Sequence, residues 1–295
     1  MLQKHFDVIH LEKITDKKIK LAIVLLFNFF SKIKYYIFAF QFKIINLLEN
    51  YDNKINKKNN IFFRNLKRNK KSLLIICNSR ESLELKNKKI FNRDIMVVND
   101  FFLSKLSRNL IPNYYLCLHP FEGGQKFNSV NDKKLYLNKF FKYIVKNKKT
   151  KFFFDPSFRL LFGNKQNIYY LNISSIPLCY FHDVNRVNIE KKFPAVSNIA
   201  LACVIFGVYL NYTNIKLIGY SIDFFVGNLA GHNLKNHNHI EKKTTLLDSP
   251  GTDDDFWMLG YIYSGWLLVK KMLASKNIKF ETNIAYSRLY LFKRN

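Results

Sequence analysis

The side chains best suited to acid–base chemistry are three histidines and an aspartate in the last third of the sequence. His232, His237 and His239 follow Asp223 within residues 219–252, a stretch rich in Gly, Asn and His. An imidazole accepts a hydroxyl proton near neutral pH, so one of the three histidines is a candidate general base. Their spacing lacks the helical or hairpin phasing of metal ligands, and we predict no metal site. A stretch of this length without periodic structure is typical of a binding loop or lid.

Polar residues also follow three short apolar runs that have the composition of buried strands. Asn78 and Ser79 directly follow the first run, Asn99 follows the second, and Asp223 comes shortly after the third, which ends at Gly219. Open α/β sheets bind ligands at the carboxyl ends of their strands, so these residues are candidates to line one crevice. Their amides and hydroxyls suit a phosphate, ribose or base edge. Capping the next helix is the alternative for each.

Short strands and helices alternate from Ser72 to the end of the sequence. The predicted strands are Leu73–Cys77, Ile95–Val98, Tyr114–Leu118, Lys151–Phe154, Ile168–Leu171, Ile215–Ile218 and Ile278–Glu281. The predicted helices are residues 100–109, 132–147, 197–210 and 253–275. This alternation predicts an α/β fold, a Rossmann-like and mostly parallel sheet with helices on both faces. No Gly-x-Gly-x-x-Gly or Walker motif is present, which argues against a dinucleotide or P-loop site.

The first 71 residues have a different pattern. A seven-residue apolar repeat over residues 16–49 predicts one long amphipathic helix, too interrupted by lysines to span a membrane. This helix either packs on the core, lies in a membrane interface or forms an oligomer seam. Residues 54–71 are basic without an acid, as in a linker near anionic lipid or a solvated loop. We therefore divide the chain into residues 1–71, possessing this helix and linker, and a catalytic domain of residues 72–295.

Composition narrows the function only in part. The net charge is +27, but the lysines are scattered among asparagines, so an anionic membrane surface or a phosphate-bearing substrate explains the charge as well as nucleic acid does. The four cysteines include no Cys-x-x-Cys pair, which fits a reducing compartment and argues against a disulfide framework or zinc site. The 16% aromatic content follows the strand and helix periods and is expected in the core.

Taken in order, these signals resemble a known family. Sialyltransferases of glycosyltransferase family 42 show the same order of features. These are a strand with an Asn-Ser turn, a strand with Asn, a Val-Ser-Asn helix, Ile-Gly-x-x-x-Asp, a His-bearing stretch, a long helix and a last strand. They recur also in related 6-hydroxymethylpterin diphosphokinase-like domains of bacterial polysaccharide loci. The resemblance spans about residues 72–295 and is most specific over 196–225, from Val-Ser-Asn to Ile-Asp-Phe-Phe.

The resemblance implies a transferase that uses a CMP-activated sialic acid without a metal or other cofactor. Asn78 and Asn99 match asparagines that contact the nucleotide, and Ser197 matches a serine that contacts the donor. His239, or else His237, corresponds to the general base that deprotonates the acceptor hydroxyl. The expected function is therefore a glycosyltransferase of surface polysaccharide or lipooligosaccharide synthesis.

Two positions depart from the family pattern. Asp223 lies in the Ile-Asp-Phe signature, but Phe225 stands where the sialyltransferases carry a tyrosine whose hydroxyl assists the departing phosphate. The usual Asn-Gly-Pro-Ser-Leu is replaced by a longer turn with Ser79 in place of the glycine. Both Ser79 and Phe225 are still expected beside the nucleotide-sugar, and both changes bear on donor specificity rather than on the fold.

The expected partners are a CMP-linked donor, a glycan or lipid-linked acceptor and an anionic membrane surface, but no nucleic acid. We therefore expect the protein in the cytoplasm, peripheral at the inner membrane. The helix at 16–49 could also form the contact of a homo-oligomer. Two alternatives stay open. One is a diphosphokinase-like enzyme that needs ATP and Mg²⁺, and the other is a non-catalytic basic protein that binds nucleic acid or membrane.

Overall fold

The computed structural model describes residues 69–77, 93–118, 129–178, 189, 193–196, 198–220 and 253–282. The chain divides into two compact units, residues 1–52 and 53–295, and all described residues belong to the second. The helix predicted at residues 16–49 lies outside the described residues. Of the predicted basic linker, only residues 69–71 are described, and they form the start of the first strand rather than a linker.

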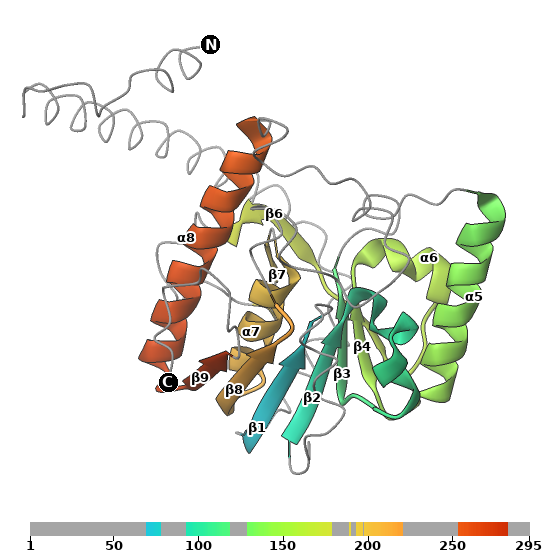
Figure 1. The fold of residues 1–295 in the computed structure, drawn as a ribbon, viewed down its shortest axis with the longest axis horizontal. Coiled ribbons are helices and arrows are strands. Elements are labelled where there is room, and N and C mark those ends of the chain that lie inside the picture. Colours follow the sequence, from blue (N-terminus) through green and yellow to red (C-terminus); the bar gives the residue numbers. More distant parts are fainter. Residues whose placement is uncertain are drawn as a thin grey trace, which may run out of the picture. The chain divides into compact units, whose positions relative to one another are not determined.

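A seven-stranded sheet forms the centre of the second unit (Figure 1). Its strands are β1 (Asn69–Ile76), β2 (Arg93–Val98), β3 (Tyr114–Cys117), β4 (Lys151–Phe154), β5 (Ile168–Tyr170), β8 (Tyr212–Ile218) and β9 (Lys279–Thr282), in the order β5-β4-β3-β2-β1-β8-β9. All six neighbouring pairs are parallel. The seven predicted strands and the predicted α/β fold class are thus confirmed.

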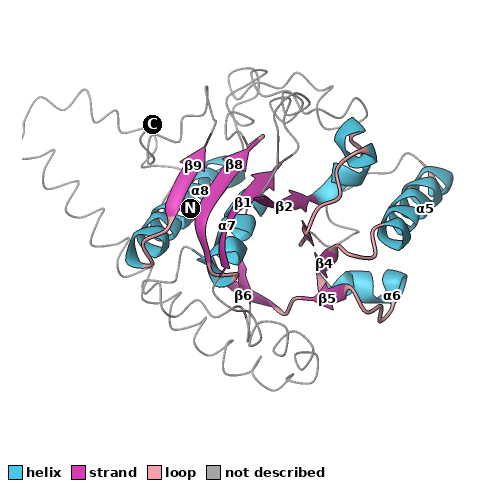
Figure 2. Cartoon of the chain, turned by 90° about the horizontal axis from the view of Figure 1, so that it is seen from below, coloured by secondary structure: helices cyan, strands magenta, loops and turns pink. Residues whose placement is uncertain are grey.

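Helices cover both faces of the sheet because the buried side chains of each strand alternate between them. Leu73 and Ile75 of β1 join one core cluster with α7 (Ile199–Tyr209) and α8 (Asp253–Ser275). Leu74 and Ile76 join the other cluster, with α5 (Val130–Lys146) and α6 (Arg159–Phe162). Figure 2 shows α7 and α8 beside β1, β8 and β9, with α5 and α6 at the β4–β5 end. Parallel strands with both faces covered are expected to contain continuous apolar runs, as Leu73–Ile76 of β1 and Ile95–Val98 of β2 do.

The helix α7 is apolar all round because it is enclosed on all sides. Its residues from Ala200 to Val208 are buried, and Phe206 packs against Phe153 of β4 with ring centroids 4.5 Å apart. A Cβ at Gly207 would lie 2.8 Å from Cδ2 of Leu73. The glycine therefore permits the close approach of α7 to β1.

Aromatic rings fill the opposite core, as their periodicity predicts. Phe140 of α5 stacks on Phe102 at 4.4 Å and meets Phe154 of β4 edge-on at 5.6 Å. Phe162 of α6 contacts Phe140 at 5.3 Å. These rings supply apolar area to the core, so α5 and α6 are fixed to the sheet by the same cluster.

Two local predictions were wrong. The helix predicted at residues 100–109 is a pair of 3₁₀ helices, η4 (Asn99–Leu103) and η5 (Lys105–Arg108), because Ser104 between them is extended, with φ −72° and ψ 153°. The pattern also missed a separate parallel pair of short strands, β6 (Ile173–Pro177) and β7 (Phe193–Ala195). In the described segments, no helix has both the length and the apolarity to cross a bilayer.

Candidate functional site

Three neighbouring strands end together at the point in the sheet where the strand order reverses. Ile76 of β1 pairs with Val97 of β2 and with Ile218 of β8. Beyond these pairs the Cys77 amide donates a hydrogen bond of 2.9 Å to the Ile218 carbonyl oxygen. From β1 the chain builds β2 to β5 outward on one side, and later places β8 and β9 on the other. Such a switch point, at the carboxyl ends of the strands, is where open α/β sheets bind ligands.

Asn99 follows β2 at this edge in a strained conformation. Its φ of 44° lies in the left-handed region, which asparagine adopts more readily than most residues. The Tyr115 hydroxyl, from β3, donates a hydrogen bond to the Asn99 carbonyl oxygen and so supports this turn. The Asn99 side-chain oxygen Oδ1 is buried and has no hydrogen-bond partner in the described structure. A buried amide oxygen without a donor is costly, so this atom is suited to accept a hydrogen bond from a ligand.

The next residue, Asp100, is held by a side-chain hydrogen bond. Asp100 is only 5% exposed, and its Oδ1 accepts a hydrogen bond of 2.5 Å from the Tyr136 hydroxyl of α5. Sequence reasoning assigned no role to Asp100 and did not find Tyr115 or Tyr136. Their signal in the sequence is weak, because a tyrosine in an aromatic core has the same pattern whether or not its hydroxyl has a partner.

The third strand leaves the edge through the expected glycine turn. Gly219 has a φ of 70°, and Tyr220 after it is buried. The Trp266 ring nitrogen Nε1, from α8, donates a hydrogen bond of 3.3 Å to the Tyr220 hydroxyl, and the two rings lie 5.6 Å apart. The chain is therefore anchored to α8 immediately before residues 221–252, which contain Asp223 and the candidate histidines.

Asn99 is the one predicted site residue that lies in the described structure. The others lie outside it: Asn78, Ser79, Ser197, Asp223, Phe225, His237 and His239. Their described chain neighbours include Cys77 at the end of β1 and Asn198 at the start of α7. The Asn198 side chain caps α7, since its Oδ1 accepts a 2.8 Å hydrogen bond from the Ala200 amide. Whether the side chains of the predicted site converge stays a prediction.

The described cysteines are unsuited to nucleophilic chemistry. Cys77, Cys117 and Cys203 are free and buried. Burial raises the pKa of the Cys77 thiol to about 12, and it raises the pKa of Cys203 well above its ordinary value. Both thiols are thus protonated at neutral pH and serve as small apolar side chains. Within the described residues, no three His, Cys, Asp or Glu side chains are grouped closely enough to hold a metal ion.

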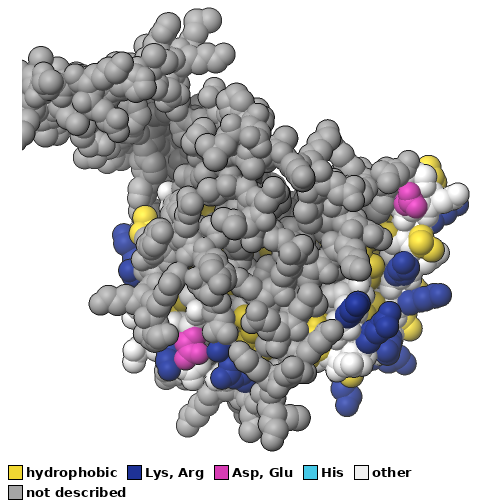
Figure 3. Space-filling view, in the orientation of Figure 1, with side chains coloured by type: hydrophobic (Ala, Val, Ile, Leu, Met, Phe, Trp, Pro, Cys, Tyr) yellow, Lys and Arg dark blue, Asp and Glu magenta, His cyan; other side chains and the backbone are white. Residues whose placement is uncertain are grey.

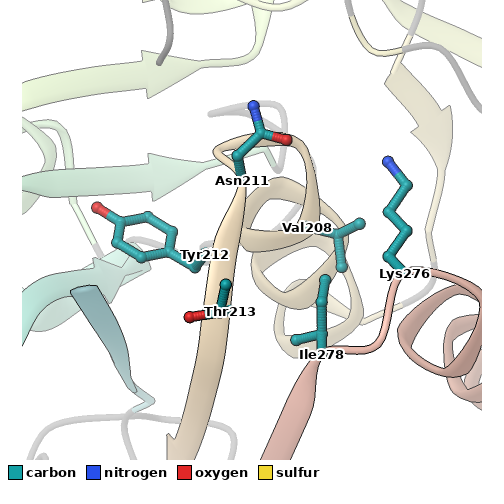
Figure 4. A pocket seen from close by; sticks show the side chains of 6 residues that line it. All are labelled: Val208, Asn211, Tyr212, Thr213, Lys276 and Ile278. Carbon is teal, nitrogen blue, oxygen red and sulfur yellow. The ribbon is translucent and has the colours of Figure 1, made fainter. Parts of the chain in front are cut away.

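A pocket of about 330 Å³ lies at the opposite, amino-terminal edge of the sheet (Figure 4). It is lined by Val208, Asn211, Tyr212, Thr213, Lys276 and Ile278. These residues belong to two tight turns, α7–β8 and α8–β9, each of which contains an asparagine with positive φ. The Lys276 ammonium lies 5.1 Å from the Tyr209 ring centroid, and the Tyr212 hydroxyl points away from the other lining residues. We interpret this pocket as the space between two structural turns, because it contains no buried charged group.

Comparisons with known proteins give distant structural likeness only. No protein-family model matches the chain, and no curated protein matches its sequence. Among solved structures, the chain is similar to the sialyltransferase CstII from Campylobacter jejuni, determined in complex with a substrate analogue, cytidine-5′-monophosphate. The TM-score is 0.41 with 12% identity, covering 76% of this chain and 84% of that one. A likeness this low does not establish a shared site or activity.

Proposed function

We propose that this protein is a glycosyltransferase that transfers a sugar, sialic acid or a related one, from a CMP-linked donor to a glycan or lipid-linked acceptor. The observation that carries the proposal is the buried, unpartnered Oδ1 of Asn99 at the edge where β1, β2 and β8 end together. A polar ligand at a topological switch point accounts for this atom, and a capping role does not. The order of motifs along residues 72–295 supports the choice of a nucleotide-sugar as that ligand.

The proposed chemistry is a direct displacement without a metal. The acceptor hydroxyl oxygen attacks the anomeric carbon of the sugar, and the bond between that carbon and the phosphate oxygen breaks. The proton passes to His239 or His237, and CMP departs with the electron pair of the broken bond. Asn78, Ser79, Asn99 and Ser197 would hold the nucleotide, with Asp223 and Phe225 beside the donor.

The setting is part of the proposal. The helix at residues 16–49 and the basic residues after it would keep the enzyme at the cytoplasmic face of the inner membrane, near lipid-linked acceptors of polysaccharide or lipooligosaccharide synthesis. Residues 72–295 would form the catalytic domain. Loss of residues 1–68, which leaves β1 whole, is therefore expected to reduce transfer to lipid-linked acceptors more than transfer to soluble ones.

The test of the general base is a transfer assay with radiolabelled nucleotide-sugars. His239→Ala or His237→Ala is expected to lower kcat about 10²- to 10⁴-fold, because the acceptor proton loses its base. His232→Ala is the matched control from the same stretch and should retain activity. Full activity in both the His237 and His239 variants contradicts the assignment.

The nucleotide is tested separately by thermal shift with CMP, UDP, GDP and ATP. Stabilisation by CMP at 100 times its Kd corresponds to about 2.7 kcal/mol and raises the melting temperature by several degrees. CMP should stabilise the protein without added divalent metal. Stabilisation by ATP only when Mg²⁺ is present would instead indicate a diphosphokinase-like enzyme.

A further inference from the structure

Exposed apolar side chains gather on two neighbouring helices on one side of the sheet. Phe141 and Val145, one turn apart on α5, are 42% and 44% exposed. Leu160 and Leu161 on α6 are 97% and 40% exposed. A leucine almost fully in water is unusual on a helix that buries an apolar neighbour, Phe162. We call the outer surface of α5 and α6 the α5–α6 face.

The two helices form one surface because they contact each other. Beneath the surface, Phe140 of α5 meets Phe162 of α6 with ring centroids 5.3 Å apart. On the outside, the Lys165 ammonium lies 4.1 Å from the Phe141 ring centroid, although it comes three residues after α6. The segment that ends α6 and the outer side of α5 therefore lie next to each other.

Basic side chains are frequent in the same part of the chain. Residues 129–165 carry ten Lys or Arg and two acids, Asp132 and Asp155. The exposed basic residues are Lys134, Lys139, Lys142, Lys146, Lys148, Lys149 and Arg159. In Figure 3, dark blue and yellow side chains lie together on the side of the molecule that α5 forms in Figure 1. One of the acids is engaged locally, since Asp155 Oδ1 accepts a 2.8 Å hydrogen bond from the Ser157 amide.

We propose that the α5–α6 face docks on an anionic lipid membrane, with Leu160, Leu161, Phe141 and Val145 entering the interface and the lysines meeting lipid phosphates. Basic residues interleaved with exposed large apolar ones are the combination that interfacial binding requires. A second copy of the same face carries the same charge and is repelled. Nucleic acid would satisfy the lysines but leave Leu160 in water, because backbone phosphates offer nothing apolar.

This docking would also orient the sheet. The helix α6 follows β4 closely, through the short 3₁₀ helix η6 (Pro156–Phe158), so it lies at the carboxyl ends of the strands. The β1–β2–β8 edge faces the same way, because all the strands are parallel. The membrane would then lie alongside the edge that holds Asn99. The inference goes beyond the transferase proposal and does not depend on it, since vesicle binding is measured without any substrate.

Insertion is tested with the full chain carrying Leu160→Trp and vesicles of equal parts phosphatidylglycerol and phosphatidylcholine. The expected result is a blue-shifted emission from the new tryptophan and its quenching by brominated lipid, after subtraction of the wild-type signal. Leu267→Trp, at a 48% exposed position on α8, is the matched control and should show neither effect. A Leu160→Trp emission unchanged by vesicles overturns the proposal, even if the protein sediments with them through another segment.

The charge contribution is tested by vesicle co-sedimentation of two double variants. Lys142→Gln/Lys146→Gln on α5 should weaken the partition coefficient about fivefold per lysine, because each lysine near an anionic surface contributes about 1 kcal/mol. Lys270→Gln/Lys271→Gln on α8 removes the same charge from exposed positions and should have little effect. All four positions are exposed, so the melting temperatures should match the wild type.

The same variants separate lipid from nucleic acid. Equal weakening by the two lysine pairs would mean that net charge alone drives binding, which overturns the proposal. So would salt-sensitive binding to a DNA or RNA oligonucleotide that requires Lys142 and Lys146, if Leu160→Trp shows no lipid quenching.

Discussion

The two edges of the parallel sheet use polar side chains differently. At the amino-terminal edge, polar side chains form hydrogen bonds with the backbone of neighbouring segments. Asn113 Oδ1 accepts a hydrogen bond of 2.8 Å from the Ile95 amide, and the buried Thr150 hydroxyl donates one of 2.6 Å to the Pro112 carbonyl oxygen. At the carboxyl edge, Asn99 Oδ1 is buried without a partner in the described structure. Satisfied polar groups stabilise the first edge, whereas the unsatisfied oxygen at the second is the atom for which we propose a ligand.

Left-handed asparagines occur at both edges and make the comparison direct. Asn211 and Asn277, with φ of 60° and 52°, form the turns into β8 and β9 at the amino-terminal edge. Asn99, with φ of 44°, follows β2 at the carboxyl edge. Asparagine serves the turn conformation in all three, but only at Asn99 does the side chain also lie where a ligand is expected. The backbone requirement and the ligand requirement can therefore be separated by mutation.

Among the variants that compare the two edges, the largest expected effect comes from Asn99→Gly. Glycine keeps the left-handed backbone at little cost and removes only the side-chain amide. We expect donor affinity to fall roughly tenfold to a hundredfold, since a hydrogen bond to a ligand is lost, while stability is unchanged or slightly higher because an unsatisfied buried oxygen is gone. Isothermal titration with CMP and chemical denaturation measure the two quantities.

Asn211→Gly at the amino-terminal edge is the matched control. It should change stability by only a few tenths of a kcal/mol to about 1 kcal/mol and leave nucleotide affinity at the wild-type value. Equal CMP affinities for Asn99→Gly and the wild type would contradict the proposal that the Asn99 side chain binds a ligand at the carboxyl edge.

The amino-terminal edge is tested by Tyr212→Phe. The Tyr212 hydroxyl donates a 2.6 Å hydrogen bond to Asp94 Oδ2 and lies 3.2 Å from the Tyr114 hydroxyl. Its removal should lower the free energy of unfolding by about 1–2 kcal/mol, because Asp94 loses a charge-assisted bond. Donor affinity should not change, since the contact lies at the edge away from Asn99.

The same variant predicts a pH dependence. Burial, and then the hydrogen bond to Asp94, raise the pKa of Tyr212 above its ordinary value of 10.0. A raised folded-state pKa stabilises the protein fully below pH 10 and loses this contribution as the pH rises further, because the unfolded tyrosine ionises first. The stability difference between wild type and Tyr212→Phe should therefore shrink above pH 10 in urea titrations. A difference that grows with pH would contradict the assignment.

Sequence patterns predicted the sheet well because its strands are buried on both faces. Lys151–Phe154 and residues 253–275 have the observed bounds, since an apolar run or a long helical period determines each. The sequence patterns gave a wrong prediction at residues 100–109, where the extended Ser104 divides the segment into two 3₁₀ helices. Local propensity does not record a single backbone break of this kind.

The candidate site was predictable only in outline. The order of strands places the ends of β1, β2 and β8 together, and polar residues directly after them mark that edge. The support given to Asn99 by Tyr115, and to Asp100 by Tyr136, depends on side-chain packing between β3, α5 and η4, which no periodicity reveals. The α5–α6 face was equally hidden, because its lysines resemble the Lys/Asn bias of the whole chain and Leu160 resembles a core residue.

The smallest expected effect lies on the outermost strand, where polar contacts face solvent. Glu281 of β9 pairs with Lys279 at 2.9 Å and with Lys216 of β8 at 3.9 Å. The hydrogen bond from Lys279 lowers the pKa of Glu281 below its ordinary value of 4.5. The stabilisation is therefore present above pH 4.5 and is lost as the pH falls below it.

Glu281→Gln is expected to change the free energy of unfolding least among the variants that compare the two edges. At neutral pH it should cost about 0.2–1 kcal/mol, because exposed ion pairs are weakened by water and salt, and about 0.5 M NaCl should reduce this cost further. Thermal unfolding of the variant and wild type at pH 7 and pH 3 measures it. A cost as large as that of Tyr212→Phe, or one that persists at pH 3, would mean that the β9 contacts belong with the buried polar network of the amino-terminal edge.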